Sequence, residues 1–179
     1  MSDEARARRS ILLTGGARSG KSRTGLALAK RLTERPVYVA TSRRVDEEHG
    51  ARIDRHRAER GPEWTTIEEP LEPSRAAPSH SVLLVDCVTL WLYNVFERER
   101  EDLDRSLAFA REEVERCFER EATWIWVTNE LGSGLHGSTP STRRFVDLQG
   151  FMNQWLAARS EAVALLVAGL PLVLKGTLP

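Results

Sequence analysis

The stretch SILLTGGARSGKSRTGLALAKRL, residues 10–32, decides the fold. Its first five residues are mostly aliphatic, as in a buried strand, and RTGLALAKRL at its end has the apolar spacing of a helix. Between them, Gly15 to Ser22 match the pattern GxxxxGK[ST] in the strand–loop–helix context that this pattern requires. The stretch therefore predicts a phosphate-binding loop, or P-loop, on an α/β scaffold.

The residue types in this loop suit a bound polyphosphate. Glycines let the backbone bend so that successive amide groups face the phosphate, and the following helix presents its positive end. Lys21 supplies a mobile cation for the β- and γ-phosphates, and the Ser22 hydroxyl is expected to bind a Mg²⁺ that bridges phosphate oxygens. A glycine-rich turn with a chance GKS is the alternative, and the flanking strand and helix argue against it. The expected loop contacts are Gly15, Gly16, Ala17, Arg18, Ser19, Gly20, Lys21 and Ser22.

Short apolar runs recur along the rest of the chain and alternate with longer amphipathic segments. Further buried strands are expected at 36–41, 81–86, 123–128 and 162–168. Alternating strands and helices predict a mostly parallel sheet with helices on both faces. The expected fold class is therefore α/β, of the P-loop NTPase type with a RecA-like sheet.

Two of the intervening segments have clear helical periods. One places its apolar residues at 4, 3, 4, 3 spacing: Leu103, Leu107, Ala110, Val114 and Cys117. The other runs from about Ser141 to Ala158, with Thr139 and Pro140 as its N-cap and first-turn residues. Four tryptophans on apolar segments are expected in the core: Trp91, Trp124, Trp126 and Trp155.

Length and charge limit the class of protein. A chain of 179 residues favours one domain, residues 1–179, with 1–9 as a flexible leader. The 26 Lys and Arg balance the 26 Asp and Glu, which removes the usual argument for a nucleic-acid partner. The apolar stretch from Ala162 to Leu174 is too short and broken to span a membrane, and is expected to form a buried strand and a turn. The charged N-terminus lacks a secretory signal, so we expect a cytoplasmic protein.

A second acidic group is expected near the metal. The strand SVLLVD ends in Asp86, which places a carboxylate at the carboxyl edge of the sheet, as a Walker B residue does. An aspartate after a strand is more often a turn former, so this assignment depends on the P-loop. Ser22 and Asp86 are the expected Mg²⁺ ligands.

The segment between the second and third expected strands carries many Arg and acidic residues around two histidines. Its acidic residues come first and its arginines last, as one helix from about Val45 to Arg60 would favour. His49, Ile53 and His56 lie at helical intervals. A neutral imidazole at His56 can attack phosphorus and form a phosphoramidate, while flanking guanidiniums hold polyphosphate oxygens. From these residues alone, a partly buried histidine without a catalytic role is the favoured interpretation.

Several segments in order resemble one family, from Ile11 to about Lys175. It is the bifunctional adenosylcobinamide kinase / adenosylcobinamide-phosphate guanylyltransferase family of cobalamin biosynthesis. The most specific motifs are GGARSGKS, RIxxHR followed by W and xEEP, and VTNExGxG. The similar segments are LLTGGARSGKSR (12–23), YVATS (38–42), ARIDRHRAERGPEWTTIEEPL (51–71), LLVDCVTLWLYN (83–94), VTNELGSGL (127–135), FVDLQGFMNQ (145–154) and VAGLPLVLK (167–175).

The resemblance implies two activities. ATP or GTP phosphorylates the aminopropanol hydroxyl of adenosylcobinamide, and GMP is then transferred from GTP to that phosphate through a guanylylated histidine, which falls on His56. The resemblance also implies a homotrimer with active sites near subunit interfaces, and adenosylcobinamide and its phosphate as small-molecule partners. Beyond the loop and Asp86, it places nucleotide contacts on Val39, Ala40, Thr41, His56, Arg57, Ala58, Glu59 and Glu68.

This chain departs from the family pattern in two places. Asp86 stands where the family frequently has Glu, which shortens the side chain by one methylene and keeps its charge. Leu135 is followed by His136 and Gly137, where the family usually has an apolar residue, Val and Pro. The contacts of that loop are therefore not carried over from the family.

Roles for three further residues stay open. Glu68 can accept from guanine or ribose donors, or can belong to an exposed acidic turn. Asn129 and Glu130 follow a strand at the ligand-binding edge, where they can orient the acceptor hydroxyl or a water, or can cap their own loop.

Two other functions compete with the bifunctional enzyme. A single-activity small-molecule kinase would use the same P-loop and leave His56 structural. A nucleotide-dependent regulatory module would normally carry a base-reading motif such as NKxD, and the sequence has none.

Overall fold

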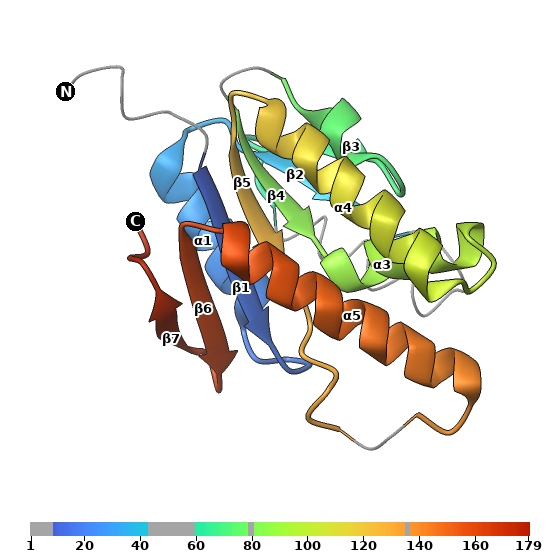
Figure 1. Cartoon of the computed structure of the whole chain (residues 1–179). Coiled ribbons are helices and arrows are strands. Elements are labelled where there is room, and N and C mark those ends of the chain that lie inside the picture. The colour runs from blue at the N-terminus through green and yellow to red at the C-terminus, as the bar shows by residue number, and fades with distance from the viewer. Residues whose placement is uncertain (1–8, 43–59, 79–80, 135–136) are drawn as a thin grey trace.

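The computed structural model describes residues 9–42, 60–78, 81–134 and 137–179. Within them, one seven-stranded sheet has the order β3-β2-β4-β5-β1-β6-β7 (Figure 1). All neighbouring strands are parallel except β6 and β7. The strands are β1 (Arg9–Gly15), β2 (Val37–Ala40), β3 (Thr65–Glu68), β4 (Val82–Asp86), β5 (Thr123–Val127), β6 (Ala162–Val167) and β7 (Leu170–Lys175).

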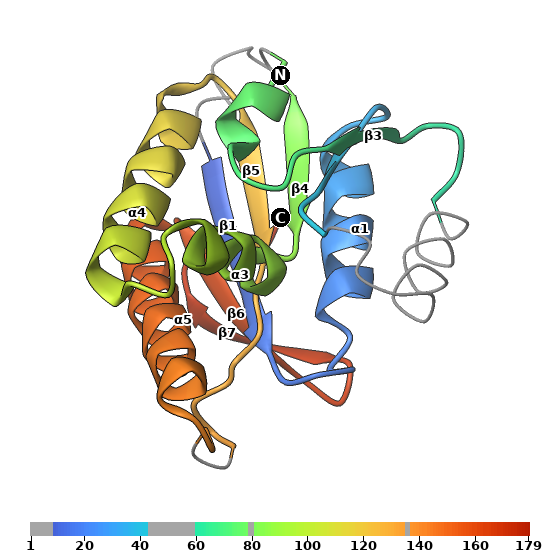
Figure 2. The same cartoon turned by 90° about the vertical axis from the view of Figure 1, so that its right-hand side faces the viewer.

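Helices cover both faces of this sheet, which confirms the predicted α/β class (Figure 2). One face carries α1 (Lys21–Leu32). The other carries α3 (Val88–Arg98), α4 (Leu103–Glu119) and α5 (Pro140–Arg159). Within the described ranges, no helix combines the length and the apolar character that crossing a membrane would need.

Alternation along the strands divides the core into two layers. Leu12 packs with α3, α4 and α5, whereas Leu13 packs with α1. This is the period of two that a strand buried on both faces imposes. The helix on the α1 side lies very close to the sheet at Gly25, where a Cβ would come within 2.8 Å of Leu84 Cδ1. Close packing of α1 fixes the loop that precedes it.

The predicted tryptophan core is confirmed. Trp91, Trp124 and Trp126 are each at most 1% exposed. The indole of Trp124 donates to the Cys117 carbonyl at 2.9 Å, which joins β5 to α4. Trp155 is partly buried against the same layer.

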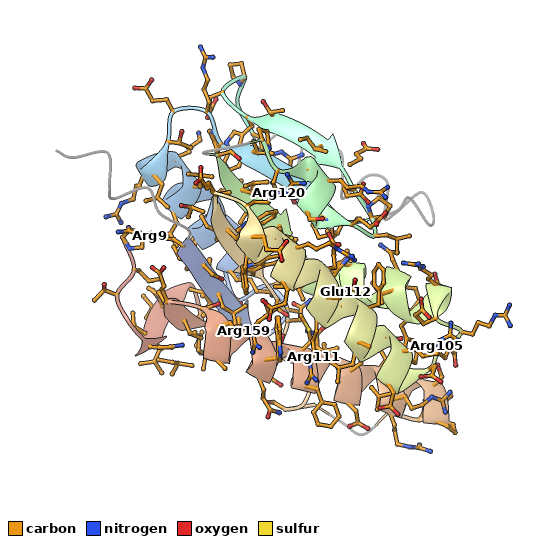
Figure 3. The ribbon with its side chains drawn as sticks, turned by 45° about the horizontal axis from the view of Figure 1, so that its top comes forward. Arg9, Arg105, Arg111, Glu112, Arg120 and Arg159 are labelled. Carbon is orange, nitrogen blue, oxygen red and sulfur yellow. The ribbon has the colours of Figure 1, made fainter. Side chains whose placement is uncertain are left out.

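The two predicted amphipathic helices are confirmed as α4 and α5. Ala110, Val114 and Cys117 of α4 are buried, while charged residues such as Arg105 and Glu112 occupy its outer side (Figure 3). Helix α5 begins at Pro140, and the Thr139 hydroxyl caps it by accepting from the Thr142 amide at 3.1 Å. An ion pair between Arg159 of α5 and Glu115 of α4, 2.9 Å long, joins the two helices.

The prediction for residues 162–174 is right for β6 and wrong for the residues after it. Leu170–Lys175 form an exposed antiparallel strand, β7, instead of a turn. The reversal needs only Ala168 and Gly169, whose φ angles of 52° and 83° are both positive. Two such residues make the tight turn that suits a β-hairpin.

Glu113 holds the short 3₁₀ helix Pro73–Ala76 against α4. Its fully buried carboxylate accepts from the Ser74 amide at 2.7 Å and from Arg116 Nε at 2.9 Å. We expect Glu113→Ala to lower the free energy of unfolding by about 2–3 kcal/mol, because the buried Ser74 amide loses a charged partner. Urea denaturation measures the loss.

The matched control for this prediction is Glu112→Ala. Glu112 is exposed and pairs with the same arginine, Arg116, at 2.8 Å. Exposed pairs contribute little, so we expect a change within about 0.5 kcal/mol. Equal losses for the two variants would contradict a special role for the buried carboxylate.

Candidate nucleotide-binding site

The strand ends bring the predicted site residues to one edge of the sheet. Ala40 of β2 is in register with Glu68 of β3 on one side and with Asp86 of β4 on the other. Asp86 is in register with Val127 of β5, which also pairs with Leu13 of β1, two residues before the P-loop. Neighbouring strands lie about 4.8 Å apart, so two strand spacings place the Glu68 backbone about 10 Å from that of Asp86.

Two positions of the P-loop, 15 and 20, need glycine. Gly15 has a φ of 155°, and a Cβ there would lie 2.6 Å from the Leu166 carbonyl oxygen. Gly20 has a φ of 95° and forms the N-cap of α1 without a side-chain cap. The first amides of α1 therefore have no capping side chain, which suits a bound anion.

Lys21 and Ser19 lie on the buried side of the loop. The Lys21 ammonium donates to the Gly16 carbonyl at 2.8 Å, and its side chain is mostly buried. The Ser19 hydroxyl is buried without a hydrogen-bond partner among the described residues. Gly16, Ala17 and Arg18 are exposed on the other side. The loop thus combines a fixed cation, an unpartnered hydroxyl and an open outer side, which fits a phosphate group.

The turn between β6 and β7 supports the P-loop from behind. The Gly169 amide donates to the Ser19 carbonyl at 2.9 Å. A Cβ at Gly20 would lie 3.0 Å from the Gly169 Cα, so the two glycines pack backbone to backbone. Sequence reasoning gave Gly169 no role, although a glycine inside an apolar run is the signal of a close backbone approach.

Tyr38 of β2 holds Asp86 of β4. Its hydroxyl donates to Asp86 Oδ2 at 3.2 Å, and the Arg60 guanidinium lies 3.7 Å from the centre of its ring. Burial, with a further contribution from the Asp86 charge, raises the pKa of Tyr38. The phenol therefore keeps its proton and orients one carboxylate oxygen. Sequence reasoning missed this role of Tyr38.

Val39 and Thr41, on either side of the half-buried Ala40, are packed inside the protein. Val39 and Thr41 are fully buried, and the Thr41 hydroxyl donates to the Cys87 carbonyl at 2.9 Å. Side-chain contacts between these two residues and a nucleotide are therefore not favoured, and the Thr41 carbonyl already accepts from Asn94 Nδ2 at 2.8 Å. Burial, followed by the Asp86 charge, raises the pKa of the Cys87 thiol to about 12, which favours the protonated thiol at neutral pH.

The remaining predicted residues divide into three groups. Glu68 is exposed at the end of β3, where it is accessible to a ligand. Glu130 accepts from the Gly132 amide at 2.8 Å, which favours loop capping for this residue. The predicted helix from Val45 and the candidates His56, Arg57, Ala58 and Glu59 lie outside the described residues, as does His136.

Ser22 and Asp86 offer donors that suit Mg²⁺. Both supply oxygen, the ligand type that this hard cation prefers, and Mg²⁺ commonly takes only one or two protein ligands beside water and phosphate. Asp86 is half-buried and oriented by Tyr38, and Ser22 lies in the first turn of α1. The donor chemistry at this edge therefore fits the ion.

Comparison with known proteins gives one family. A family model described as cobinamide kinase / cobinamide phosphate guanyltransferase matches residues 11–174. The bifunctional adenosylcobalamin biosynthesis protein CobP of Pseudomonas aeruginosa is 42% identical over 170 residues, which cover 92% of this chain and 96% of that protein. CobU of Escherichia coli, with the same bifunctional description, is 34% identical over 181 residues, covering 92% and 99%.

Among solved structures, one match is the flagellar accessory protein FlaH from Methanocaldococcus jannaschii. It matches with a TM-score of 0.48 and 13% sequence identity, covering 96% of this chain and 80% of that chain.

Proposed function

Because the chain belongs to the cobinamide kinase / cobinamide phosphate guanyltransferase family, we propose that it carries out both reactions on adenosylcobinamide. It phosphorylates adenosylcobinamide with ATP or GTP, and then transfers GMP from GTP to the phosphate, giving adenosylcobinamide-GDP. One domain serves both reactions. The observation that carries this proposal is the match over residues 11–174, which includes the P-loop and His56.

In the kinase reaction, the P-loop binds the nucleotide phosphates. The amides at the start of α1 and the Lys21 ammonium stabilise the charge on the γ-phosphoryl group as it is transferred. The substrate hydroxyl attacks the γ-phosphorus in line, the bond to the β–γ bridging oxygen breaks, and ADP or GDP leaves. Tyr38 keeps Asp86 oriented at the same edge of the sheet.

We further propose that Ser22 and Asp86 hold Mg²⁺ beside the bound nucleotide. A bound Mg²⁺ supplies positive charge that neutralises the phosphate oxygens during transfer. The chain's own contribution is to present the Ser22 hydroxyl from the first turn of α1 and the Asp86 carboxylate from the end of β4.

In the guanylyl transfer, His56 is the proposed nucleophile. An unprotonated ring nitrogen attacks the α-phosphorus of GTP, and the bond to the α–β bridging oxygen breaks to release pyrophosphate. A phosphate oxygen of adenosylcobinamide phosphate then attacks the same phosphorus and displaces the histidine. Two sequential displacements let a single nucleotide site serve both reactions. Arg57 and Glu59 beside His56, and Glu68 at the end of β3, are the proposed contacts to the rest of GTP.

Product analysis tests the proposal. With adenosylcobinamide and ATP alone, we expect chromatography to show adenosylcobinamide phosphate and no later product. Addition of GTP should convert that phosphate to adenosylcobinamide-GDP with release of pyrophosphate. If adenosylcobinamide phosphate accumulated and was not converted when GTP was present, the protein would be a single-activity kinase. The family match does not favour this alternative.

We also propose a homotrimer, and the exposed hairpin supports an association surface. Among the strands that the structure describes, β7 is the last of the sheet, so its outer edge has backbone groups that none of them pairs. Leu170 is 73% exposed, and Val167, Leu172 and Leu174 are each 58% exposed. Contiguous exposed apolar side chains of this kind mark interaction surfaces.

Sedimentation equilibrium measures the association directly. We expect a mass three times that of the 20.2 kDa chain. Leu172→Lys should shift the equilibrium toward the monomer, because it buries a charge in the apolar contact. A monomer at all concentrations of the natural chain would contradict the proposal.

A further inference from the structure

A network of polar side chains joins α5, the end of β5 and the start of α3. Gln149 Nε2 donates to Thr128 Oγ1 and to Asn153 Oδ1, both at 2.9 Å. Thr128 Oγ1 donates to Asn153 Oδ1 at 2.8 Å, and Asn153 Nδ2 donates to the Asn129 carbonyl at 3.0 Å. Thr128 and Gln149 are buried. A buried, connected network of this kind fixes the backbone that it binds.

The network ends on Asn129, which lies between the start of the P-loop and the start of α3, just after Asp86. On one side, the neighbouring amides of Thr128 and Glu130 donate to the carbonyls of Leu13 and Gly15, at 2.9 and 3.1 Å. Asn129 therefore flanks the first residues of the P-loop. On the other side, it contacts Thr89, three residues after Asp86 on α3.

Asn129 contacts Thr89 through both its main-chain and its side-chain nitrogen. The main-chain amide donates to Thr89 Oγ1 at 3.1 Å, and the side-chain Nδ2 donates to the same oxygen at 3.0 Å. The Asn129 carbonyl is committed to Asn153. The acceptor that remains on Asn129 is Oδ1 of the carboxamide, beside the second hydrogen of Nδ2, on a half-exposed side chain.

An amide oxygen accepts a hydrogen bond and cannot donate one. It therefore suits a substrate hydroxyl, which brings a proton, and does not suit a phosphate oxygen, which is itself an acceptor. The kinase reaction places one such hydroxyl beside the γ-phosphate at this edge of the sheet.

We propose that Asn129 Oδ1 accepts the hydrogen bond of the acceptor hydroxyl during phosphorylation, with Thr89 and Asn153 as positioning residues. The amide orients the hydroxyl oxygen toward the γ-phosphorus and takes no proton. When the new P–O bond forms and the β–γ bridging bond breaks, the hydroxyl proton passes to water. This inference rests on the proposed function, because the hydroxyl is that of adenosylcobinamide.

The test separates the two reactions of one protein. In Asn129→Leu, we expect kcat for adenosylcobinamide phosphorylation to fall on the order of 100-fold, because a misplaced nucleophile loses its alignment. The KM for the nucleotide should stay within about twofold, because the Asn129 side chain is not assigned to the phosphates. The extent to which GTP guanylylates the variant in the absence of acceptor should equal that of the natural chain. This covalent label also shows that the variant is folded.

Variants at Thr89 test the positioning role. Thr89→Val removes the oxygen that holds the carboxamide and should lower phosphorylation about tenfold, whereas Thr89→Ser keeps that oxygen and should recover most of the activity. Gln154→Ala is the matched control on α5, one residue after Asn153 and exposed. It should behave like the natural chain in both reactions.

The outcomes are distinct. Unchanged phosphorylation in Asn129→Leu, or an equal loss of phosphorylation and enzyme guanylylation, would overturn the role of Asn129. A natural chain with neither activity would overturn the proposed function itself.

Discussion

Lys21→Met is expected to abolish both activities of the enzyme. The side chain keeps its length and loses its charge. In the structure the Lys21 ammonium lies at the P-loop, 2.8 Å from the Gly16 carbonyl, with its side chain mostly buried. Loss of that fixed cation removes charge stabilisation from the phosphoryl group under attack, so we expect kcat/KM for phosphorylation to fall on the order of 1,000-fold.

The enzyme's guanylylation by GTP should fall together with phosphorylation, because one nucleotide site serves both reactions. Initial rates of nucleoside diphosphate and pyrophosphate release measure the two losses. Lys30→Met is the matched control: it makes the same change on the same helix, but Lys30 is half-exposed and pairs with Glu63 on the surface. A Lys21→Met protein that lost phosphorylation and kept full guanylylation would require two separate nucleotide sites.

His56→Asn is expected to separate the two reactions. Asparagine keeps a polar side chain at this position and cannot form the covalent phosphoramidate. Transfer of GMP should therefore fall about 1,000-fold or more, since loss of a covalent nucleophile removes the whole two-step route. Phosphorylation depends on the P-loop and should stay within a few-fold of the natural chain. The expected product in the presence of ATP and GTP is adenosylcobinamide phosphate.

His49→Asn provides the control within the same segment. The sequence places His49 seven residues before His56, among the same charged side chains, with no chemical role assigned to it. It should retain both reactions. Equal loss of GMP transfer in the two variants would indicate that the segment acts through its fold or charge and not through one nucleophile.

The features that sequence predicted best are those with local signals. Gly15 to Ser22 form the loop that the motif requires, because Gly15 and Gly20 stand where positive φ angles and close contacts leave no room for a Cβ. The buried parallel strands and the helices α4 and α5 follow from apolar periodicity over many residues. Asp86 lies at the edge where its strand was expected to end.

Elements with mixed patterns were missed. Strand β3 has four residues, and none of them is fully buried, so it lacks the apolar run of the other strands. Helix α3 is apolar on most sides, with six buried residues in eleven, which hides its helical period. Strand β7 is exposed along its whole length. Its residues are nearly all apolar, so they show no alternation of apolar and polar residues that would have indicated an exposed strand.

Contacts at the site between residues far apart in the chain could not be predicted from the sequence either. Tyr38 meets Asp86 across 48 positions, and Gly169 reaches Ser19 from the far end of the chain. No local spacing encodes such pairs, since strand order brings them together. From the sequence, two roles for Asn129 were equally favoured: orienting the acceptor hydroxyl and capping its own loop. The hydrogen bond of its side chain to Thr89, 40 positions away, fixes the orientation of its carboxamide.

Intact-protein mass spectrometry after incubation with GTP and Mg²⁺ tests the central claim most directly. The account predicts that the natural chain gains the mass of one guanylate, that fragmentation places it on His56, and that His56→Ala gains nothing under the same conditions. A natural chain that stays unmodified while it converts adenosylcobinamide phosphate, or a His56→Ala variant that still takes up the guanylate, would contradict the covalent route.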